Sequence, residues 1–328
     1  MRAKADRFFV GPRAGLVAAL LTVLLGATVA GCGGGGGAGS STTAAAPASK
    51  LADRVLVSGA NPAVKPADLA RPIARYKRHV AAALGTMEGD VRRLQGAVDA
   101  GDLAAARQAW LDADASYESI GAAYGAFGAL DARINGETAG LPGGAGSPDF
   151  TGLHRIELAL FGRGSVADAG PYVPRLAADV RALRRKIPSL RIEPLEYVLR
   201  GHEVFEGALD LQLSGRASPW SSDALVALDA NLRGTRVVIG TLRPLIDPRE
   251  PLLIGRIDRS LDMLARTLRG LAGPGGMMPR WDRLPAAEKT LVSGQTAAAA
   301  EELAYVPEVV DPRPPVPERS AIGAVQAE

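Results

Sequence analysis

The stretch IGRIDRSLDMLARTLRGL, residues 254–271, repeats apolar side chains at steps of three and four residues. This spacing gathers the apolar side chains on one face of an α-helix and leaves charged groups on the other face. The apolar positions are Ile254, Ile257, Leu261, Leu264, Leu268 and Leu271. The stretch therefore predicts an amphipathic helix that packs against other helices.

The same period extends over most of the chain on both sides of this stretch. It predicts further helices over about 68–98, 103–127, 151–161, 173–187, 194–213, 222–242 and 285–306. No alternating pattern is long enough to predict a sheet. We therefore predict an all-α fold of seven or eight helices, arranged as two four-helix-bundle-like halves.

The net charge is confined to the N-terminal segment. The first 31 residues hold four basic residues and one acidic residue, which accounts for the whole formal net charge of +3. The other 34 basic and 34 acidic residues balance, which argues against a nucleic-acid-binding surface. An apolar run over 14–30 follows the basic residues, a pattern typical of a signal peptide.

Cys32, the single cysteine, follows this apolar run in the sequence VAGC (residues 29–32), which resembles a bacterial lipobox. The resemblance implies that residues 1–31 are cut off. Cys32 would then carry palmitate-type acyl chains at the outer face of the cytoplasmic membrane, in the periplasmic space. An uncleaved anchor is the alternative. One cysteine also excludes a disulfide framework and a thiolate metal site.

Composition divides the rest of the mature chain into three parts. Residues 32–54 are rich in Gly, Ser, Thr and Ala, cannot bury a core, and are expected to be a flexible linker. The helical domain is predicted over 55–310, and a Pro-rich tail over 311–328.

Histidine and glutamate side chains fall on helix faces that the apolar spacing predicts to be buried. The helix predicted over 194–213 carries His202 and Glu206 on its leucine seam. A shorter helix carries His154 and Glu157 three residues apart, and its opposite face is also apolar. Burying such groups unpaired would cost several kcal/mol, so we expect them to have partners.

Two carboxylates, Asp114 and Glu118, flank an aromatic seam, and Asp131 follows it. They form either the wall of a polar pocket or a solvated helix face. Imidazole and carboxylate groups without thiolate could ligate iron, manganese, zinc or copper inside a helical bundle. An internal hydrogen-bond network is the other explanation of the same residues.

The sequence TGLHRIE over 151–157 resembles the TGFHRIE segment of the imelysin-like EfeO/EfeM family. The segments YESIG over 117–121, GAFGALDARIN over 125–135 and GHEVFE over 201–206 resemble other motifs of that family, in the same order. The resemblance covers roughly residues 65–310. It implies one imelysin-like helical domain with a metal-binding cleft, in the short form that lacks a cupredoxin domain.

The resemblance also implies the ligands and the partners. Carried over by position, the metal ligands would be His154, Glu157, Glu118, Asp131, Glu206 and His202. The cargo would be iron, Fe²⁺ or Fe³⁺, with Zn²⁺ or Cu²⁺ as surrogates. The partners would be the membrane iron permease and the haem peroxidase of an EfeUOB-type ferrous-iron uptake system, and the lipid anchor would hold the chain at the membrane.

One segment departs from the family pattern. The chain reads SSDAL over 221–225 where the family often reads SHTDL, so a histidine is missing. Ser222 or Asp223 is still predicted to cap the helix that follows.

These residues support three functions. The first is a non-enzymatic lipoprotein that captures iron and delivers it to a permease. The second is a metallopeptidase that uses His202, Glu203 and Glu206, a sequence one residue away from the H-E-x-x-H zinc motif. The third is a surface-binding lipoprotein without a metal.

Overall fold

The computed structural model describes residues 62–313, which form helices joined by turns and loops. No β-strand occurs within this range, as the sequence predicts. The helices are α1 Ala70–Asp99, α2 Leu103–Glu118, α3 Tyr124–Phe127, α4 Ala129–Asn135, α5 Gly152–Glu157, α6 Val166–Ala169, α7 Val173–Lys186, α8 Pro194–Gly207, α9 Ala224–Ile246, α10 Leu253–Leu271 and α11 Ala286–Val309. The predicted signal peptide, lipid attachment site and linker, and most of the Pro-rich tail, lie outside the described residues.

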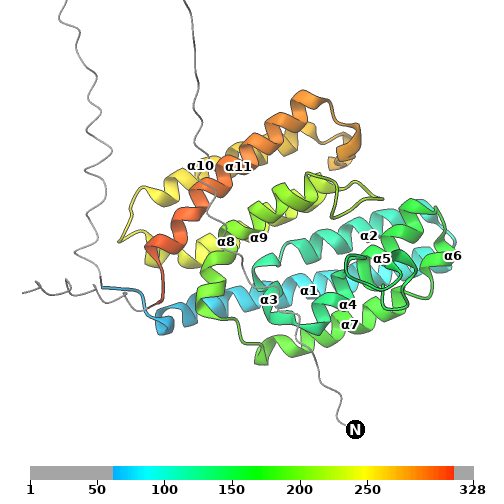
Figure 1. Cartoon of the computed structure of the whole chain (residues 1–328), viewed down its shortest axis with the longest axis horizontal. Helices are drawn as coiled ribbons and strands as arrows, with labels where there is room; N and C mark the ends of the chain where they lie inside the picture. The colour runs from blue at the N-terminus through cyan, green and yellow to red at the C-terminus, as the bar shows by residue number, and fades with distance from the viewer. Residues whose placement is uncertain (1–61, 314–328) are drawn as a thin grey trace, which may run out of the picture. The chain divides into compact units, whose positions relative to one another are not determined.

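The helices form the two predicted halves (Figure 1). In the first half, α1 packs against α2 and α7, and α7 packs against α4 and α5. In the second half, α11 packs against α8 and α10, and α9 packs against α8 and α10. Because α9 also packs against α1 and α2, it joins the halves and brings their side chains within reach of each other.

The turn between α1 and α2 falls between the two helices predicted over 68–98 and 103–127. Gly101 has a φ of 72°, which a residue without Cβ adopts without strain. The next residue, Asp102, accepts a hydrogen bond from the backbone nitrogen of Ala105 at 2.9 Å and so caps α2. α1 and α2 are therefore antiparallel neighbours.

The second helix is shorter than predicted. It ends at Glu118, and a 3-10 turn over Gly121–Ala123 leads into α3. Tyr124 closes the break, because its hydroxyl donates to the carbonyl of Tyr117 at 2.8 Å. The prediction of one helix to Phe127 was wrong because a 3-10 turn repeats every three residues and preserves the apolar spacing.

The buried face of α8 also differs from the prediction. The structure buries Tyr197, Val198, Gly201 and Phe205, whereas Glu206 is exposed. The large rings of Tyr197 and Phe205 therefore determine which face of the helix is buried, and the leucine spacing does not. The prediction that Glu206 lies on a buried seam was wrong.

Two glycines let helices approach more closely than a side chain would permit. At Gly152, which has a φ of 79°, an added Cβ would lie 2.3 Å from the carbonyl oxygen of Ile134 at the end of α4. At Gly234 on α9, a Cβ would lie 2.2 Å from the carbonyl oxygen of Ser119, just after α2. These contacts bring α5 against α4, and α9 against the end of α2 that carries Glu118.

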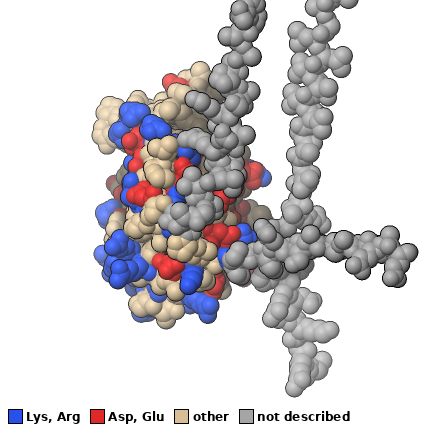
Figure 2. All heavy atoms as spheres, turned by 90° about the vertical axis from the view of Figure 1, so that its left-hand side faces the viewer, with Lys and Arg blue, Asp and Glu red and all other residues tan. Residues whose placement is uncertain are grey.

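The surface carries charges of both signs. Figure 2 shows Lys and Arg intermixed with Asp and Glu on one face, with Lys and Arg most dense towards its lower left edge. Some charges of the described residues pair across helices, as Arg236 does with Asp262 and Arg243 with Asp258. Within residues 62–313, no helix is both long enough and apolar enough to cross a membrane.

Candidate metal centre

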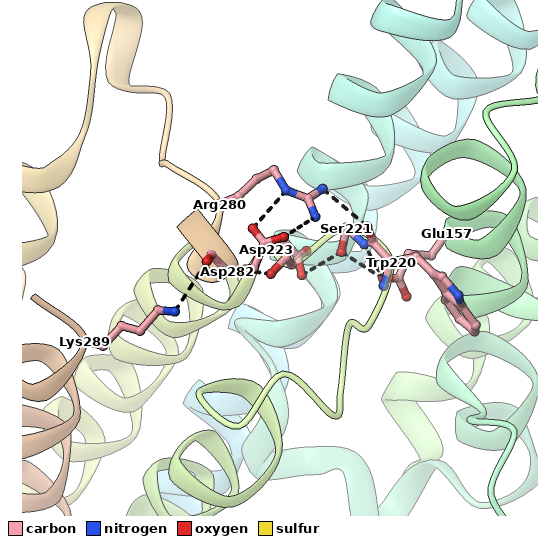
Figure 3. Close-up of polar contacts among 8 residues, drawn as sticks. Glu157, Trp220, Ser221, Asp223, Arg280, Asp282 and Lys289 are labelled. Carbon is pink, nitrogen blue, oxygen red and sulfur yellow. Dashed lines mark hydrogen bonds and ion pairs between the residues drawn. The ribbon is translucent and has the colours of Figure 1, made fainter. Parts of the chain in front are cut away.

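Glu157, at the end of α5, is fully buried and is the most heavily hydrogen-bonded carboxylate of the region. Its Oε1 accepts bonds from the backbone nitrogens of Trp220 at 3.0 Å and Ser221 at 2.8 Å, and from Ser221 Oγ at 2.9 Å. Figure 3 shows these contacts from the loop that precedes α9. Three donors on one oxygen hold the carboxylate in a single position.

His154 lies one turn before Glu157 and is 6% exposed. Its Nδ1 lies 3.0 Å from Glu157 Oε2, so the two predicted ligands form a buried pair. Burial lowers the pKa of His154, but the hydrogen bond and charge of Glu157 outweigh burial and raise it overall. α2 supports this helix, because Trp110 Nε1 donates to the carbonyl of Leu153 at 2.9 Å.

Glu118 reaches the same region from the end of α2. Its Oε2 accepts bonds from Gln212 Nε2 at 2.6 Å and from Asn231 Nδ2 at 3.1 Å. Burial raises the pKa of Glu118 to about 7; the charge of Asp223 adds to this rise, and the two amides oppose it. The interpretation of Glu118 as part of a solvated helix face is therefore wrong.

Asp114 and Asp223 complete a set of four carboxyl groups, which we call the acidic cluster: Asp114, Glu118, Glu157 and Asp223. Asp114 is 2% exposed and Asp223 is 4% exposed. Burial and the charges of Asp223, Glu118 and Glu157 hold the pKa of Asp114 well above its usual value. Burial and the charge of Glu157 likewise raise the pKa of Asp223.

The sequence predicts that Asp223 or Ser222 caps α9, but the side chain of Asp223 does not. Its side chain makes no cap hydrogen bond, and its Oδ1 accepts from Ser221 Oγ at 3.0 Å. The other oxygen, Oδ2, is buried and has no donor among the described residues. Ser222 does not cap the helix either, because its Oγ accepts from the backbone nitrogen of Asp282 at 3.1 Å.

Asp131 lies beside the acidic cluster without joining it. It accepts a hydrogen bond from Tyr117 Oη at 2.6 Å, and burial raises its pKa. Tyr117 stacks on Tyr124, with ring centroids 4.9 Å apart. The charges of both Glu118 and Asp131 contribute to the raised pKa of Tyr124, so both carboxyl groups act on the same tyrosine hydroxyl.

No hydrogen bond or ion pair among residues 62–313 joins the predicted residues of α8 to the acidic cluster. Glu206 is exposed, and His202 is half-buried with a buried Nδ1 that has no hydrogen-bond partner among the described residues. Glu203 forms an ion pair with Arg200 at 3.2 Å. The metallopeptidase hypothesis needs these three residues to converge on one ion, and this arrangement gives it no support.

The chemistry of the acidic cluster fits a cation, although its present geometry is not a closed coordination site. Among residues 62–313, no three His, Cys, Asp or Glu side chains are spaced to hold a metal ion. Yet three buried carboxyl groups and that of the half-buried Glu118 repel one another, and Asp223 Oδ2 lacks a donor. Either protons or a divalent cation can relieve this repulsion. Oxygen donors with one imidazole suit iron, manganese or zinc.

Sequence reasoning underestimated two members of the acidic cluster. The spacing of Asp114 and Glu118 put them on one face of a helix, but spacing does not reveal whether that face is buried. Asp223 was assigned a capping role because it stands before a helix. In the family pattern the aspartate stands one position later, where this chain has Ala224. This displacement was the signal in the sequence that could have pointed to Asp223.

The fold and the site define an all-helical protein with a buried acidic cluster between α2, α5 and the start of α9. A family model described as imelysin, which also carries a peptidase label, matches residues 72–306. The chain therefore belongs to the imelysin family, as its motifs predict.

Curated relatives support the same assignment. The chain is 25% identical over 241 residues to the iron uptake system component EfeM of Pseudomonas syringae pv. syringae, covering 74% of this chain and 85% of that protein. It is 28% identical over 253 residues to the iron uptake system component EfeO of Yersinia pseudotuberculosis serotype I, covering 76% and 67%. It is 27% identical over 234 residues to EfeO of Escherichia coli O1:K1, covering 71% and 62%.

Proposed function

We propose that this chain acts in iron uptake as a non-enzymatic protein that binds iron at the acidic cluster. The buried, mutually repelling carboxyl groups of Asp114, Glu118, Glu157 and Asp223 are the observation that supports it most strongly. The paired imidazole of His154 adds a nitrogen donor at the edge of the cluster. The names of the relatives supply the identity of the metal.

We further propose that the chain is an extracytoplasmic lipoprotein that hands iron to a membrane permease, in a system that includes a haem peroxidase. The leader over 1–31 and the cysteine at its end support the location. Capture and delivery need ligands and a tether, and no catalytic step is required. A surface-binding lipoprotein without a metal is the alternative.

Fe(II) binding should release protons and should strengthen as the pH rises. The pKa of about 7 keeps the Glu118 carboxyl group partly protonated near neutral pH, and the pKa of Asp114 is raised as well, so a cation must displace protons. Glu118 loses its proton between about pH 6 and pH 8, so this proton alone should make the apparent affinity rise by about tenfold across that range. Anaerobic calorimetry in buffers of different ionisation enthalpy measures the affinity and the protons released.

The free protein should show the opposite trend in stability. A carboxyl group whose folded pKa lies above its unfolded pKa destabilises the fold once both states are ionised. For Glu118, stability should therefore fall as the pH rises from about 4.5 through about 7.

If the wild-type chain takes up no Fe(II) at any pH, the surface-binding alternative is favoured and the proposed function is wrong.

Replacing Cys32 with serine should move the protein from the membrane fraction to the soluble extracytoplasmic fraction. The serine side chain cannot accept the thioether-linked lipid, and the anchor provides the membrane affinity. Cell fractionation followed by immunodetection measures the distribution. Retention of Cys32→Ser in the membrane fraction would instead show an uncleaved apolar anchor.

A further inference from the structure

The connection between α10 and α11, residues 272–285, is fixed to the loop that holds Glu157. The backbone nitrogen of Trp281 donates to the carbonyl of Ser222 at 2.8 Å. Trp281 is 7% exposed, and Lys289 Nζ lies 5.7 Å from its ring centroid. Ser222 has a φ of 59°, which is unfavourable for a residue with a side chain. The contacts from the connection support this conformation.

Arg280 places a permanent positive charge beside the acidic cluster. Its Nη1 donates to the carbonyl of Trp220 at 3.3 Å, and its Nε and Nη2 bind the carboxylate of Asp282 at 3.1 and 2.8 Å (Figure 3). The hydrogen bond to Asp282 raises the pKa of Arg280, and the charges of Asp223 and Glu157 add to this effect. The backbone nitrogen of Trp220 donates to Glu157 Oε1 at 3.0 Å, so the guanidinium group and a cluster carboxylate bind the same residue of the loop.

Arg280 does not block the oxygens of the cluster. Among the described side chains its ion-pair partner is Asp282, and it forms no ion pair with Asp223 or Glu157. Asp223 Oδ2 has no hydrogen-bond donor among the described residues, Arg280 included. Arg280 thus acts on the cluster through its electric field, while Asp282 holds the guanidinium in place.

We propose that Arg280 is a built-in counter-charge that weakens cation binding by the acidic cluster and so permits release of the cargo. A fixed positive charge stabilises the empty, negatively charged cluster and repels an incoming divalent cation. Because Glu157 and Asp223 are buried, salt screens this repulsion less than it would between two exposed charges. This inference rests on the proposed function, since it concerns the affinity of that same site.

Three substitutions in the full-length mature chain test it. Arg280→Gln removes the charge and keeps hydrogen-bonding groups, and Arg280→Lys keeps the charge. Arg283→Gln is the matched control, because Arg283 is exposed on the same turn and its side chain makes no hydrogen bond or ion pair among the described residues. Anaerobic calorimetry gives the Fe(II) affinity, and stopped-flow transfer to a chelator gives the dissociation rate.

Arg280→Gln should bind Fe(II) about tenfold more tightly or better and release it correspondingly more slowly. Arg280→Lys and Arg283→Gln should stay within about threefold of wild type. Hydrogen exchange of the backbone amides over 273–285 shows whether the connection stays in place. Unchanged or weaker Fe(II) binding by Arg280→Gln would overturn the inference. If the weaker binding came with faster amide exchange over 273–285, the role of Arg280 would be to hold the connection in place. If wild type itself does not bind, the proposed function fails first.

Discussion

Replacing Glu157 with glutamine is expected to weaken Fe(II) binding about 100-fold or more while the protein stays folded. Glutamine keeps an oxygen that accepts the bonds from Trp220 and Ser221, but it lacks the negative charge that binds a cation. His154→Ala should weaken binding as well, by about tenfold or more, because it removes the imidazole that pairs with Glu157. Anaerobic calorimetry measures both effects.

Glu157→Ala is a less informative variant. It would leave two backbone nitrogens without their acceptor inside the protein, and the Ser221 hydroxyl would keep only Asp223 Oδ1. Each unsatisfied buried donor costs about 1–3 kcal/mol, so the loop before α9 would shift and the fold would lose stability. Loss of binding in Glu157→Ala would then have two causes, which Glu157→Gln separates.

Glu203→Gln is the matched control for this prediction. Glu203 is also a glutamate on a helix, but it pairs with Arg200 away from the acidic cluster. It should bind Fe(II) as wild type does. Wild-type binding by Glu157→Gln and His154→Ala would show that the metal site lies elsewhere. Loss of binding, or of a peptidase activity, in Glu203→Gln would revive the metallopeptidase hypothesis.

Gly152→Ala is expected to destabilise the protein by about 3 kcal/mol or more. The φ of 79° is unfavourable for alanine, and the new methyl group would lie 2.3 Å from the Ile134 carbonyl oxygen and 2.5 Å from that of Arg133. The end of α4 or the start of α5 must move to relieve these contacts. Because α5 carries His154 and Glu157, Fe(II) affinity should fall together with stability. Urea unfolding followed by circular dichroism measures the stability.

Gly96→Ala provides the comparison. Gly96 lies within α1, and a Cβ added there meets nothing within 4 Å. Alanine should therefore be neutral or stabilise the helix by about 0.5–1 kcal/mol. Equal effects of the two substitutions on stability would contradict the close approach of α4 and α5 at Gly152.

Much of the helical architecture could be predicted because hydrophobic periodicity is a local property. The stretch over 254–271 predicted α10, and the apolar spacing predicted separate helices over 68–98 and 103–127, which correspond to α1 and the start of α2. The prediction failed after Glu118, because an α-helix and a 3-10 turn can carry the same spacing of apolar residues. It also failed on α8, where two aromatic rings outweigh several leucines in choosing the buried face.

From the sequence alone follow the all-helical class, the family and the pair formed by His154 and Glu157, because a spacing of three residues on a helix makes side chains neighbours. The inclusion of Asp114 and Asp223 in the same site, and the absence of Glu206 from it, depend on packing. These side chains come from segments far apart in the chain, and close contacts such as that of Gly234 with Ser119 set their approach. Burial then raises the carboxyl pKa values, and burial is a property of the assembled helices.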